Sequence, residues 1–427
     1  MSLAVSAFAG HTLIDGTLRG SEIYPGTVHT YKIAVPDSYD GATPAALYVG
    51  LDGILCNAPE VIDSLMAAGR MPVTVSVFLQ PGYIADEDGN VLRYNRSNEF
   101  DATDSRFAEF LEEELFPAVE ATKTADGRRI VLSRQPENRM IFGLSSGGIA
   151  AFNAAWHRPD LFGKVFSGCG TFVPMRGGND IEAIVRKHEP LPLRIFLQDG
   201  FSDTWNPIFG SWYEGNRKLA SALEFAGYDC AFDWAEGGHS VARSSQIFPE
   251  VMTWMWRDYP AALSAGETGN GLLKGLLIPG EDWSPLSEVH AVSASKEAVF
   301  PGGAHVAVAI PGSNYLDQYI IGTNGKRKYG QRFYWLHTID NTALDINSMA
   351  FDGDGWLWVL TTAGIQICDQ NGRVRGILRL PSGFNAEKGS LTIAEGSITI
   401  TDGNRSYTRR MNVHRNNDIR PASQGAG

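Results

Sequence analysis

The chain has 427 residues, of which 43% are hydrophobic and 20% are charged, and its formal net charge is -12. This length exceeds one typical domain and favours two, and the composition is that of a globular protein with a sizeable core. The acidic balance argues against nucleic acid as a general partner, because phosphate binding requires a basic surface.

Other functional classes are also excluded by simple patterns. No run reaches about 18 apolar residues, so we expect no membrane span. The four cysteines are widely spaced without a CxxC pair, so we expect neither a zinc site nor another cofactor. The start of the chain has a short apolar piece without a basic segment before it, which does not predict a signal peptide. The compartment stays open: cytoplasmic for the sequence as written, or periplasmic or secreted if a leader has been removed.

The first part of the chain, from about residue 28 to 260, alternates strand-like and helix-like segments. Alternation of this kind with apolar strands predicts an α/β fold, an α/β-hydrolase-type mostly parallel sheet with helices on both faces. The first strands are expected to pair antiparallel. The predicted strands are 29–36, 45–53, 73–82, 139–145, 164–169, 193–200 and 230–237, and the predicted helices are 58–71, 105–121, 147–158, 214–227 and 245–259.

The texture changes after Pro260. A small, Gly-rich segment predicts a linker over 263–272, and short strand-like runs joined by Asp-Gly and Asn-Gly turns follow it. We therefore predict an α/β-hydrolase domain over 1–262, a smaller all-β domain over 273–415 and a disordered tail over 416–427.

The stretch GLSSG, from Gly143 to Gly147, matches the pattern G-x-S-x-G. It follows an apolar strand and precedes a helix, which is the strand–turn–helix setting that a nucleophilic serine requires. Ser145 is the central serine of this frame. The alternative interpretation is a Gly-rich turn with a serine N-cap, because short glycine motifs also occur by chance.

A nucleophilic serine needs a base and an acid that orients it. His239 lies in a loop after the last predicted strand, and Asp203 lies in a loop after the strand before it. The chain order Ser145, Asp203, His239 is that of α/β-hydrolases. Asp199, at the end of the same strand, remains the alternative acid.

An oxyanion formed during acyl transfer needs backbone N–H donors. We expect one from Ser146 and a second from Gly53 or Ile54, in the loop after strand 45–53. Near the acid loop, four aromatic residues are candidates to stack on a sugar or phenol ring: Trp205, Phe209, Trp212 and Tyr213. Core packing is an equal interpretation for Trp212. Arg176 is a candidate to bind an anionic substrate.

Four segments, VHTYKIAVPDSYD, GLSSGGIAAFNAAWHRPDLFGKVFSGCG, LRIFLQDGFSD and GGHS, resemble one esterase family. This family contains enterochelin esterases, esterase D, and the feruloyl and acetylxylan esterases of carbohydrate esterase family one. The resemblance covers about residues 20–260 and implies a serine esterase with Ser145, His239 and Asp203 as its triad. The segment YNRSNEFD resembles the family's Arg-x-x-Glu segment, which implies a buried ion pair between Arg96 and Glu99.

The segment from Ile346 to Gly383 resembles a blade of gluconolactonase and regucalcin-like β-propellers. About 150 residues hold only three to four blades at the usual ~40–45 residues per blade. Asn347-Ser348-Met349 occupies the place of the family's metal-binding aspartate, which argues against a metal-dependent lactonase. An incomplete propeller leaves sheet edges open, so we hypothesise a homodimer.

These observations favour hydrolysis of sugar-linked feruloyl or acetyl esters of plant polysaccharide, in an enzyme of a bacterium that degrades such material. The expected partner is a small-molecule or oligosaccharide ester. The alternatives are a trilactone-siderophore esterase, for which Arg176 would meet the anionic ligand, and a non-catalytic binding protein.

Overall fold

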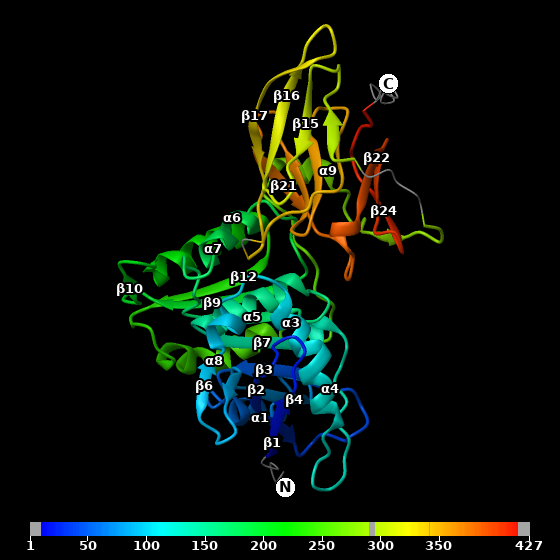
Figure 1. The fold of residues 1–427 in the computed structure, drawn as a ribbon. Helices are drawn as coiled ribbons and strands as arrows, with labels where there is room; N and C mark the ends of the chain where they lie inside the picture. Colours follow the sequence, from blue (N-terminus) through cyan, green and yellow to red (C-terminus); the bar gives the residue numbers. More distant parts are fainter. Residues whose placement is uncertain (1–9, 290–294, 341, 417–427) are drawn as a thin grey trace. The chain divides into compact units, whose positions relative to one another are not determined.

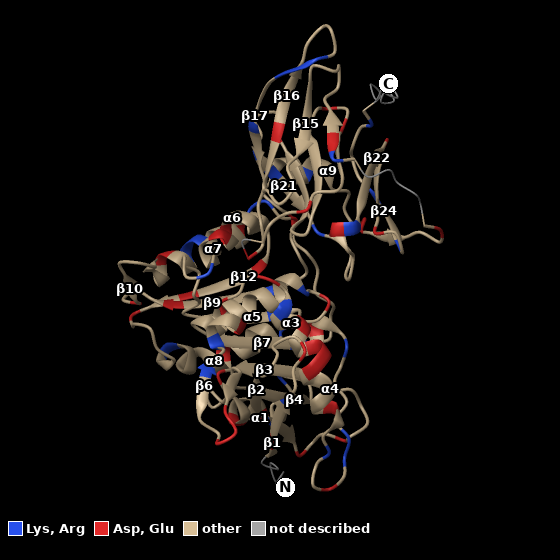
Figure 2. Cartoon of the chain, viewed as in Figure 1, with Lys and Arg blue, Asp and Glu red and all other residues tan. Residues whose placement is uncertain are grey.

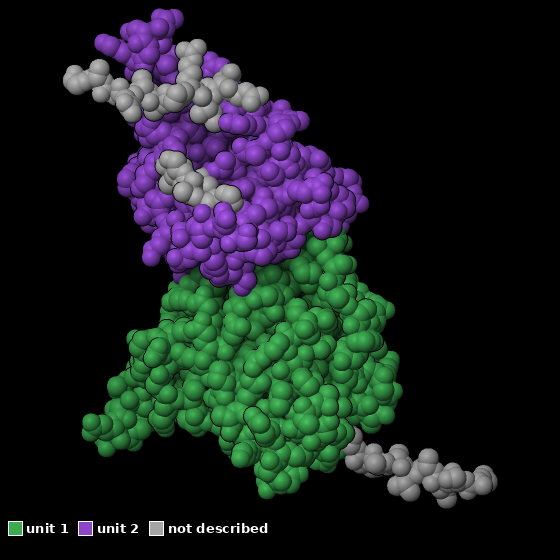
Figure 3. All heavy atoms as spheres, turned by 90° about the vertical axis from the view of Figure 1, so that its right-hand side faces the viewer, with its two compact units in different colours: residues 1–182, 190–266 green, residues 183–189, 267–427 purple. Residues whose placement is uncertain are grey.

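The computed structural model describes residues 10–289, 295–340 and 342–416 (Figure 1). The chain divides into two compact units, coloured separately in Figure 3. Unit 1 comprises Met1–Glu182 and Pro190–Gly266, and unit 2 comprises Ala183–Glu189 and Glu267–Gly427. The apolar piece at the start of the chain and all but the first residue of the predicted tail lie outside the described residues. No helix in the described ranges combines the length and apolar character needed to span a bilayer.

Unit 1 is built on a sheet of ten strands within the described residues, in the order β12-β9-β8-β7-β3-β4-β2-β5-β6, with β1 paired to β2. Strands β3, β4, β7, β8, β9 and β12 pair in parallel, while the pairs β1–β2, β2–β4, β2–β5 and β5–β6 are antiparallel. The predicted fold class and the antiparallel start are therefore confirmed. The strands are β1 (His11–Arg19), β2 (Val28–Pro36), β3 (Ala46–Leu51), β4 (Thr74–Leu79), β5 (Tyr83–Ala85), β6 (Val91–Tyr94), β7 (Arg139–Leu144), β8 (Lys164–Gly168), β9 (Arg194–Gly200) and β12 (Asp229–Ala235).

Helices cover both faces of this sheet (Figure 1), so its central strands are buried along their whole length, as continuous apolar runs require. Tyr48, Phe142 and Phe166 point from the sheet into one core with Phe248 of α8. The predicted helix 105–121 is continuous but contains a π-helical turn, Leu111–Leu115. The helices are α1 (Ala58–Ala67), α2 (Arg96–Phe100), α3 (Arg106–Phe110), α4 (Phe116–Ala121), α5 (Ser146–His157), α6 (Ile181–Val185), α7 (Trp212–Ala226) and α8 (Ala242–Met255), and a short hairpin is formed by β10 (Trp205–Asn206) and β11 (Gly210–Ser211).

Unit 2 contains α9 (Gly271–Leu276) and, within its described residues, three antiparallel sheets of four strands each. Helix α9 begins inside the predicted linker, where the Asn270 side chain accepts the N–H groups of Leu272 and Leu273. The sheets are β14 (Glu297–Val299), β15 (His305–Ala309), β16 (Tyr315–Ile321) and β17 (Arg327–Trp335); β18 (Met349–Phe351), β19 (Leu357–Thr361), β20 (Gly364–Cys368) and β21 (Val374–Leu378); and β22 (Ser390–Ala394), β23 (Ser397–Thr401) and β24 (Ser406–Arg410) with β13 (Ser284–Pro285) beside β24.

One turn recurs through unit 2. Asp352, Asp369 and Asp402 each follow a strand and accept two backbone N–H groups with the same carboxylate oxygen, Oδ1. Each turn contains a glycine at positive φ, which closes a tight reversal. These local turns explain the all-β architecture that the Asp-Gly and Asn-Gly pairs predicted. The resemblance to a propeller stays a prediction.

Candidate active site

Ser145 occupies the sharp turn between β7 and α5. Its backbone has φ +57° and ψ -121°, a region that residues with a side chain rarely adopt. The turn needs glycine on both sides, because a Cβ on Gly143 would lie 2.2 Å from the carbonyl oxygen of Gly147. A Cβ on Gly148 would lie 2.7 Å from Ser167 Oγ. The serine therefore stands on a strained strand-to-helix corner, as the motif predicted.

The Ser145 hydroxyl lies beside a small polar network. Its Oγ is 3.4 Å from Thr171 Oγ1, which also accepts a hydrogen bond of 3.2 Å from the indole Nε1–H of Trp212. The Trp212 ring meets the His239 ring edge-on, with 6.0 Å between ring centroids. Trp212 is buried and contacts both Thr171, through its N–H, and the His239 ring.

His239 and Asp203 form a hydrogen-bonded pair. The imidazole Nδ1 lies 2.7 Å from Asp203 Oδ1, the Asp203 side chain is fully buried, and the imidazole is 31% exposed. With Nδ1–H donated to the carboxylate, Nε2 is left to accept a proton. Among the described residues, no hydrogen bond joins His239 directly to Ser145. Trp212 contacts the His239 ring and donates to Thr171, which lies beside the Ser145 hydroxyl.

Asp199, the alternative acid, lies beside both Asn216 and Asp203. Its carboxyl accepts the Gly200 N–H and the Asn216 side-chain amide, at 2.7 and 2.8 Å. Burial raises the pKa of Asp199 to about 9, and the neighbouring Asp203 adds to the rise. Burial also works to raise the pKa of Asp203, but hydrogen bonds from His239, from Asp199 and from the Thr204 amide outweigh it and leave that pKa below its usual value. At neutral pH, Asp199 is thus the protonated partner and Asp203 the charged one.

The predicted oxyanion donors differ in availability. Ser146 is the first residue of α5, where backbone N–H groups have no partner within the helix. The Gly53 N–H donates to the carbonyl of Leu79 at 3.0 Å, so the prediction that Gly53 serves as a donor is wrong. For Ile54, no hydrogen bond of its N–H is recorded among the described residues, which leaves it as the candidate in this loop.

The predicted ion pair between Arg96 and Glu99 is also wrong. Arg96 makes a two-pronged contact with Asp52, with both N···O distances 2.8 Å, and its Nη2 lies 3.5 Å from the carbonyl oxygen of Leu144. Glu99 instead binds the buried His29 ring at 2.9 Å. Arg96 therefore ties the loop before Gly53 to the residue before Ser145, a role that no spacing in the sequence indicated.

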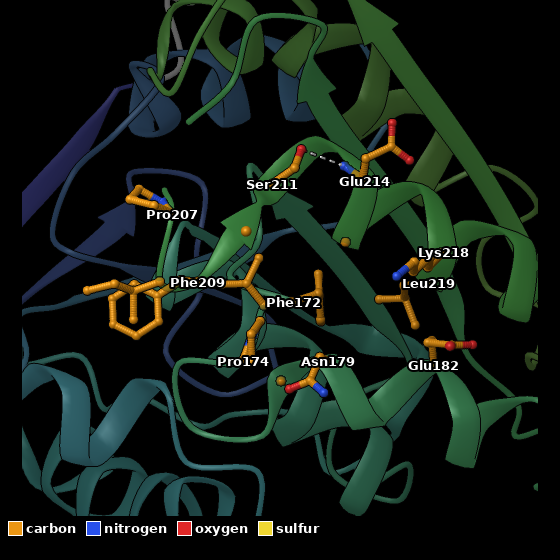
Figure 4. Close-up of a pocket in the computed structure, with 15 residues that line it drawn as sticks. Phe172, Pro174, Asn179, Glu182, Pro207, Phe209, Ser211, Glu214, Lys218 and Leu219 are labelled. Carbon is orange, nitrogen blue, oxygen red and sulfur yellow. Dashed lines mark hydrogen bonds between the residues drawn. The ribbon is translucent and has the colours of Figure 1, made fainter. Parts of the chain in front are cut away.

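A cavity of about 360 Å³ lies beside this network (Figure 4). Its wall contains Phe172, which directly follows Thr171, and Ser211, which directly precedes Trp212. Most of the remaining lining comes from the loop after β8, the β10–β11 hairpin and the start of α7. Apolar side chains such as Phe172, Pro174 and Phe209 line the cavity, with Glu182, Glu214 and Lys218 toward one side.

Of the predicted substrate-binding residues, Phe209 lines this cavity, whereas Trp205, Trp212, Tyr213 and Arg176 do not. Trp205 is 70% exposed on β10, and Trp212 is buried behind Thr171. Arg176 lies over α2, with Nη1 3.4 Å from Ser97 O and from Asn98 Oδ1. The sequence signal for the cavity was the pair of apolar loop segments around Phe172 and Ile208, which stand where loops are usually polar.

Cys169 adds a third titratable group to the pair. One ligand atom from each of Cys169, Asp203 and His239 lies within 4.8 Å of the others. Burial raises the pKa of the Cys169 thiol well above its usual value, with Asp199 and Asp203 adding to it. Within this cluster, His239 Nδ1 is already hydrogen-bonded to Asp203 Oδ1, an arrangement suited to proton transfer.

Residues 24–256 match the model of the family described as "Putative esterase". The match covers more than half of the chain. The chain belongs to this esterase family. It is therefore an enzyme that hydrolyses carboxylic esters, which confirms that part of the sequence interpretation.

Several solved structures are similar to part of this chain. A ferulic acid esterase matches with 17% identity and a TM-score of 0.42, over 58% of this chain and 98% of its own. The enterobactin esterase of Shigella flexneri matches with 21% identity and a TM-score of 0.42, over 58% of this chain and 59% of its own. An S-formylglutathione hydrolase of Staphylococcus aureus matches with 14% identity and a TM-score of 0.40, over 58% and 98%. No curated protein matches the chain.

Proposed function

We propose that this esterase acts through Ser145 as nucleophile, His239 as general base and Asp203 as the acid that orients the histidine. The observation that carries the proposal is the strained Ser145 at the start of α5, near a buried Asp203 that holds His239 by Nδ1. A strained corner of this kind costs stability and persists where a side chain must be presented to a substrate.

The chemistry follows from these positions. His239 Nε2 takes the Ser145 proton as Oγ attacks the ester carbonyl, and the imidazolium that forms is stabilised by the charged Asp203. The N–H groups of Ser146 and Ile54 then receive the negative oxygen. His239 returns the proton to the departing alcohol, which leaves an acyl group on Ser145. Water attacks this acyl-enzyme with His239 again as base, and the acid and free Ser145 are released.

For the substrate, we propose a sugar-linked ester, feruloyl or acetyl, of plant polysaccharide. The apolar cavity bounded by Phe172, Pro174 and Phe209 supports an aromatic group such as feruloyl, because pockets for small ligands are lined mainly by apolar and aromatic side chains. The trilactone-siderophore alternative requires cations that face a strongly anionic ligand. Arg96 is neutralised by Asp52, which leaves Arg176 as the candidate for that role.

The test compares wild type with Ser145→Ala on p-nitrophenyl acetate, methyl ferulate and a siderophore trilactone. We expect hydrolysis of methyl ferulate and a loss of at least about 10⁴-fold in kcat in the variant, because the nucleophile and its base act as a unit. Ser64→Ala, on the exposed side of α1, is the matched control and should retain full activity. Equal rates for wild type and Ser145→Ala would exclude the serine mechanism, and preferred hydrolysis of the trilactone would select the alternative substrate.

A further inference from the structure

The hairpin of β16 and β17 in unit 2 has an unusual composition. Residues 315–335 contain four cations and one acid, a net charge of +3 in a chain of net charge -12. Six of these 21 residues are aromatic, whereas aromatic residues form 11% of the whole chain. Figure 2 shows Lys and Arg along β17 and at the turn that joins it to β16. A positive, aromatic segment in an acidic protein indicates an anionic partner.

Tyr329 is held in an unfavourable conformation with its ring in solvent. Its φ is +53° and its side chain is 79% exposed. A positive φ is a genuine outlier for a bulky residue, and its cost persists only where the surrounding structure imposes it. The register of β16 and β17 shifts between Gln318 and Ile320, so Tyr329 and Gly330 lie opposite the single residue Tyr319. Bulges of this kind re-aim side chains, and the positive φ of Tyr329 lies within this one.

The cations near Tyr329 fall into two classes. Arg327 is neutralised by both carboxylate oxygens of Glu297, and Arg332 lies over the Tyr315 ring, 5.6 Å from its centroid. Lys326 and Lys328 are exposed, and no side-chain partner of either is recorded in the described residues. Two exposed ammonium groups therefore lie within three residues of the exposed Tyr329 ring along the chain.

We propose that this hairpin binds an anionic polysaccharide, a chain of sugar rings that carry uronate carboxylates. The Tyr329 ring stacks on the apolar face of a sugar, and Lys326 and Lys328 pair with carboxylates of neighbouring sugars. Binding of a nucleic acid needs more cations than this, because each neutralised phosphate takes one and the rest of the chain is acidic. The choice of a polysaccharide rests on the proposed function, since esters of plant polysaccharide occur on such chains.

The experiment uses full-length protein with Ser145→Ala, which prevents turnover, and measures binding to polygalacturonate, neutral arabinoxylan and single-stranded poly(dT). We expect binding to polygalacturonate that weakens as salt is raised. Lys328→Ser and Tyr329→Gly should each weaken it about tenfold. Lys388→Ser removes an exposed lysine elsewhere in unit 2 and should leave it unchanged. Tyr329→Gly also relieves the positive φ, so its thermal midpoint should be equal or higher, which separates lost binding from lost folding.

Three results would overturn the proposal. They are no binding to polygalacturonate, binding by Lys328→Ser and Tyr329→Gly that is as tight as that of the parent protein, or tighter binding to poly(dT) than to polygalacturonate. A change of sedimentation on Tyr329→Gly without any polymer would instead make the hairpin an interface between copies of the chain. Hydrolysis of methyl ferulate by Tyr329→Gly in the otherwise wild-type chain should be unchanged. The hairpin proposal can therefore fail without affecting the proposal that Ser145 is the nucleophile.

Discussion

The chain reverses direction with different kinds of residue in the two units. In unit 1, the loops after the parallel strands β3, β7 and β8 contain Asp52, Ser145 and Cys169, all non-glycine residues at positive φ. In unit 2, the reversals between antiparallel strands are closed by glycines and by aspartates that bind their own backbone. Parallel strands end at one edge, so the strained loops of unit 1 converge there, whereas the hairpin turns of unit 2 are each satisfied locally. The difference indicates why the candidate chemistry gathers in unit 1.

Among the changes in unit 1, Asp203→Asn is expected to reduce activity the most. The amide cannot stabilise an imidazolium and favours the wrong histidine tautomer, so we expect kcat to fall about 10⁴-fold. Steady-state kinetics on methyl ferulate measure the effect. The matched change is Asp199→Asn, which keeps a hydrogen-bond donor toward Asp203 and should cost far less. Similar losses of kcat for both variants would show that His239 is oriented by Asp199 and Asp203 together and not by Asp203 alone.

The next largest effect is expected for Arg96→Lys. A lysine cannot make the two-pronged contact with Asp52, so the loop that bears Ile54 loses its tie to the turn before Ser145. We expect kcat to fall roughly 10- to 100-fold with KM little changed, because the oxyanion donors act mainly in the transition state. Arg158→Lys removes an equivalent two-pronged contact, with Asp160, at the other end of α5 and is the control. A rise in KM alone for Arg96→Lys would show that Arg96 binds substrate directly.

The local character of the turns in unit 2 is tested by Asp352→Ala. Asp352 Oδ1 accepts the N–H groups of Asp354 and Trp356, and Oδ2 accepts the buried Trp358 indole N–H at 2.9 Å. Removing the carboxylate leaves that indole unpaired, which costs about 2 kcal/mol of unfolding free energy. Denaturant unfolding measures the cost, and hydrolysis of methyl ferulate at 25 °C should stay at the wild-type rate. Lost activity in a folded variant would show that the units are coupled.

The last prediction concerns the pH dependence of stability at Asp199. The pKa of Asp199 is about 9 in the folded chain, against an unperturbed value of 3.8. Between pH 3.8 and pH 9, the folded state therefore holds a proton that the unfolded state has already released. The stabilisation is complete below pH 3.8 and decreases as pH rises toward 9. Asp199→Asn removes this dependence, so the variant should gain thermal stability relative to wild type from pH 5 to pH 8.5. An unchanged difference between the two midpoints across this range would show that Asp199 is ionised in the folded protein.

The Gly-x-Ser-x-Gly turn, the mostly parallel sheet and the all-β second part were all predictable from the sequence. Each depends on interactions within a few residues or on a repeating apolar pattern, and the linear sequence contains both. The contact between Asp203 and His239 was predictable for a related reason. In a parallel sheet, residues that follow successive strands meet at one edge, so chain order indicates proximity.

Only the tertiary structure decided which polar groups pair. Arg96 binds Asp52, 44 residues earlier, instead of its neighbour Glu99, and the Gly53 N–H is donated to Leu79. Segment Ala183–Glu189 belongs to unit 2 although both of its flanks belong to unit 1. Buried donors and acceptors must all find partners, and the closest partner in space depends on how strands and helices pack. Periodicity and turn residues therefore determine the elements and their order, while the selection among competing partners is made only when distant segments are brought into contact.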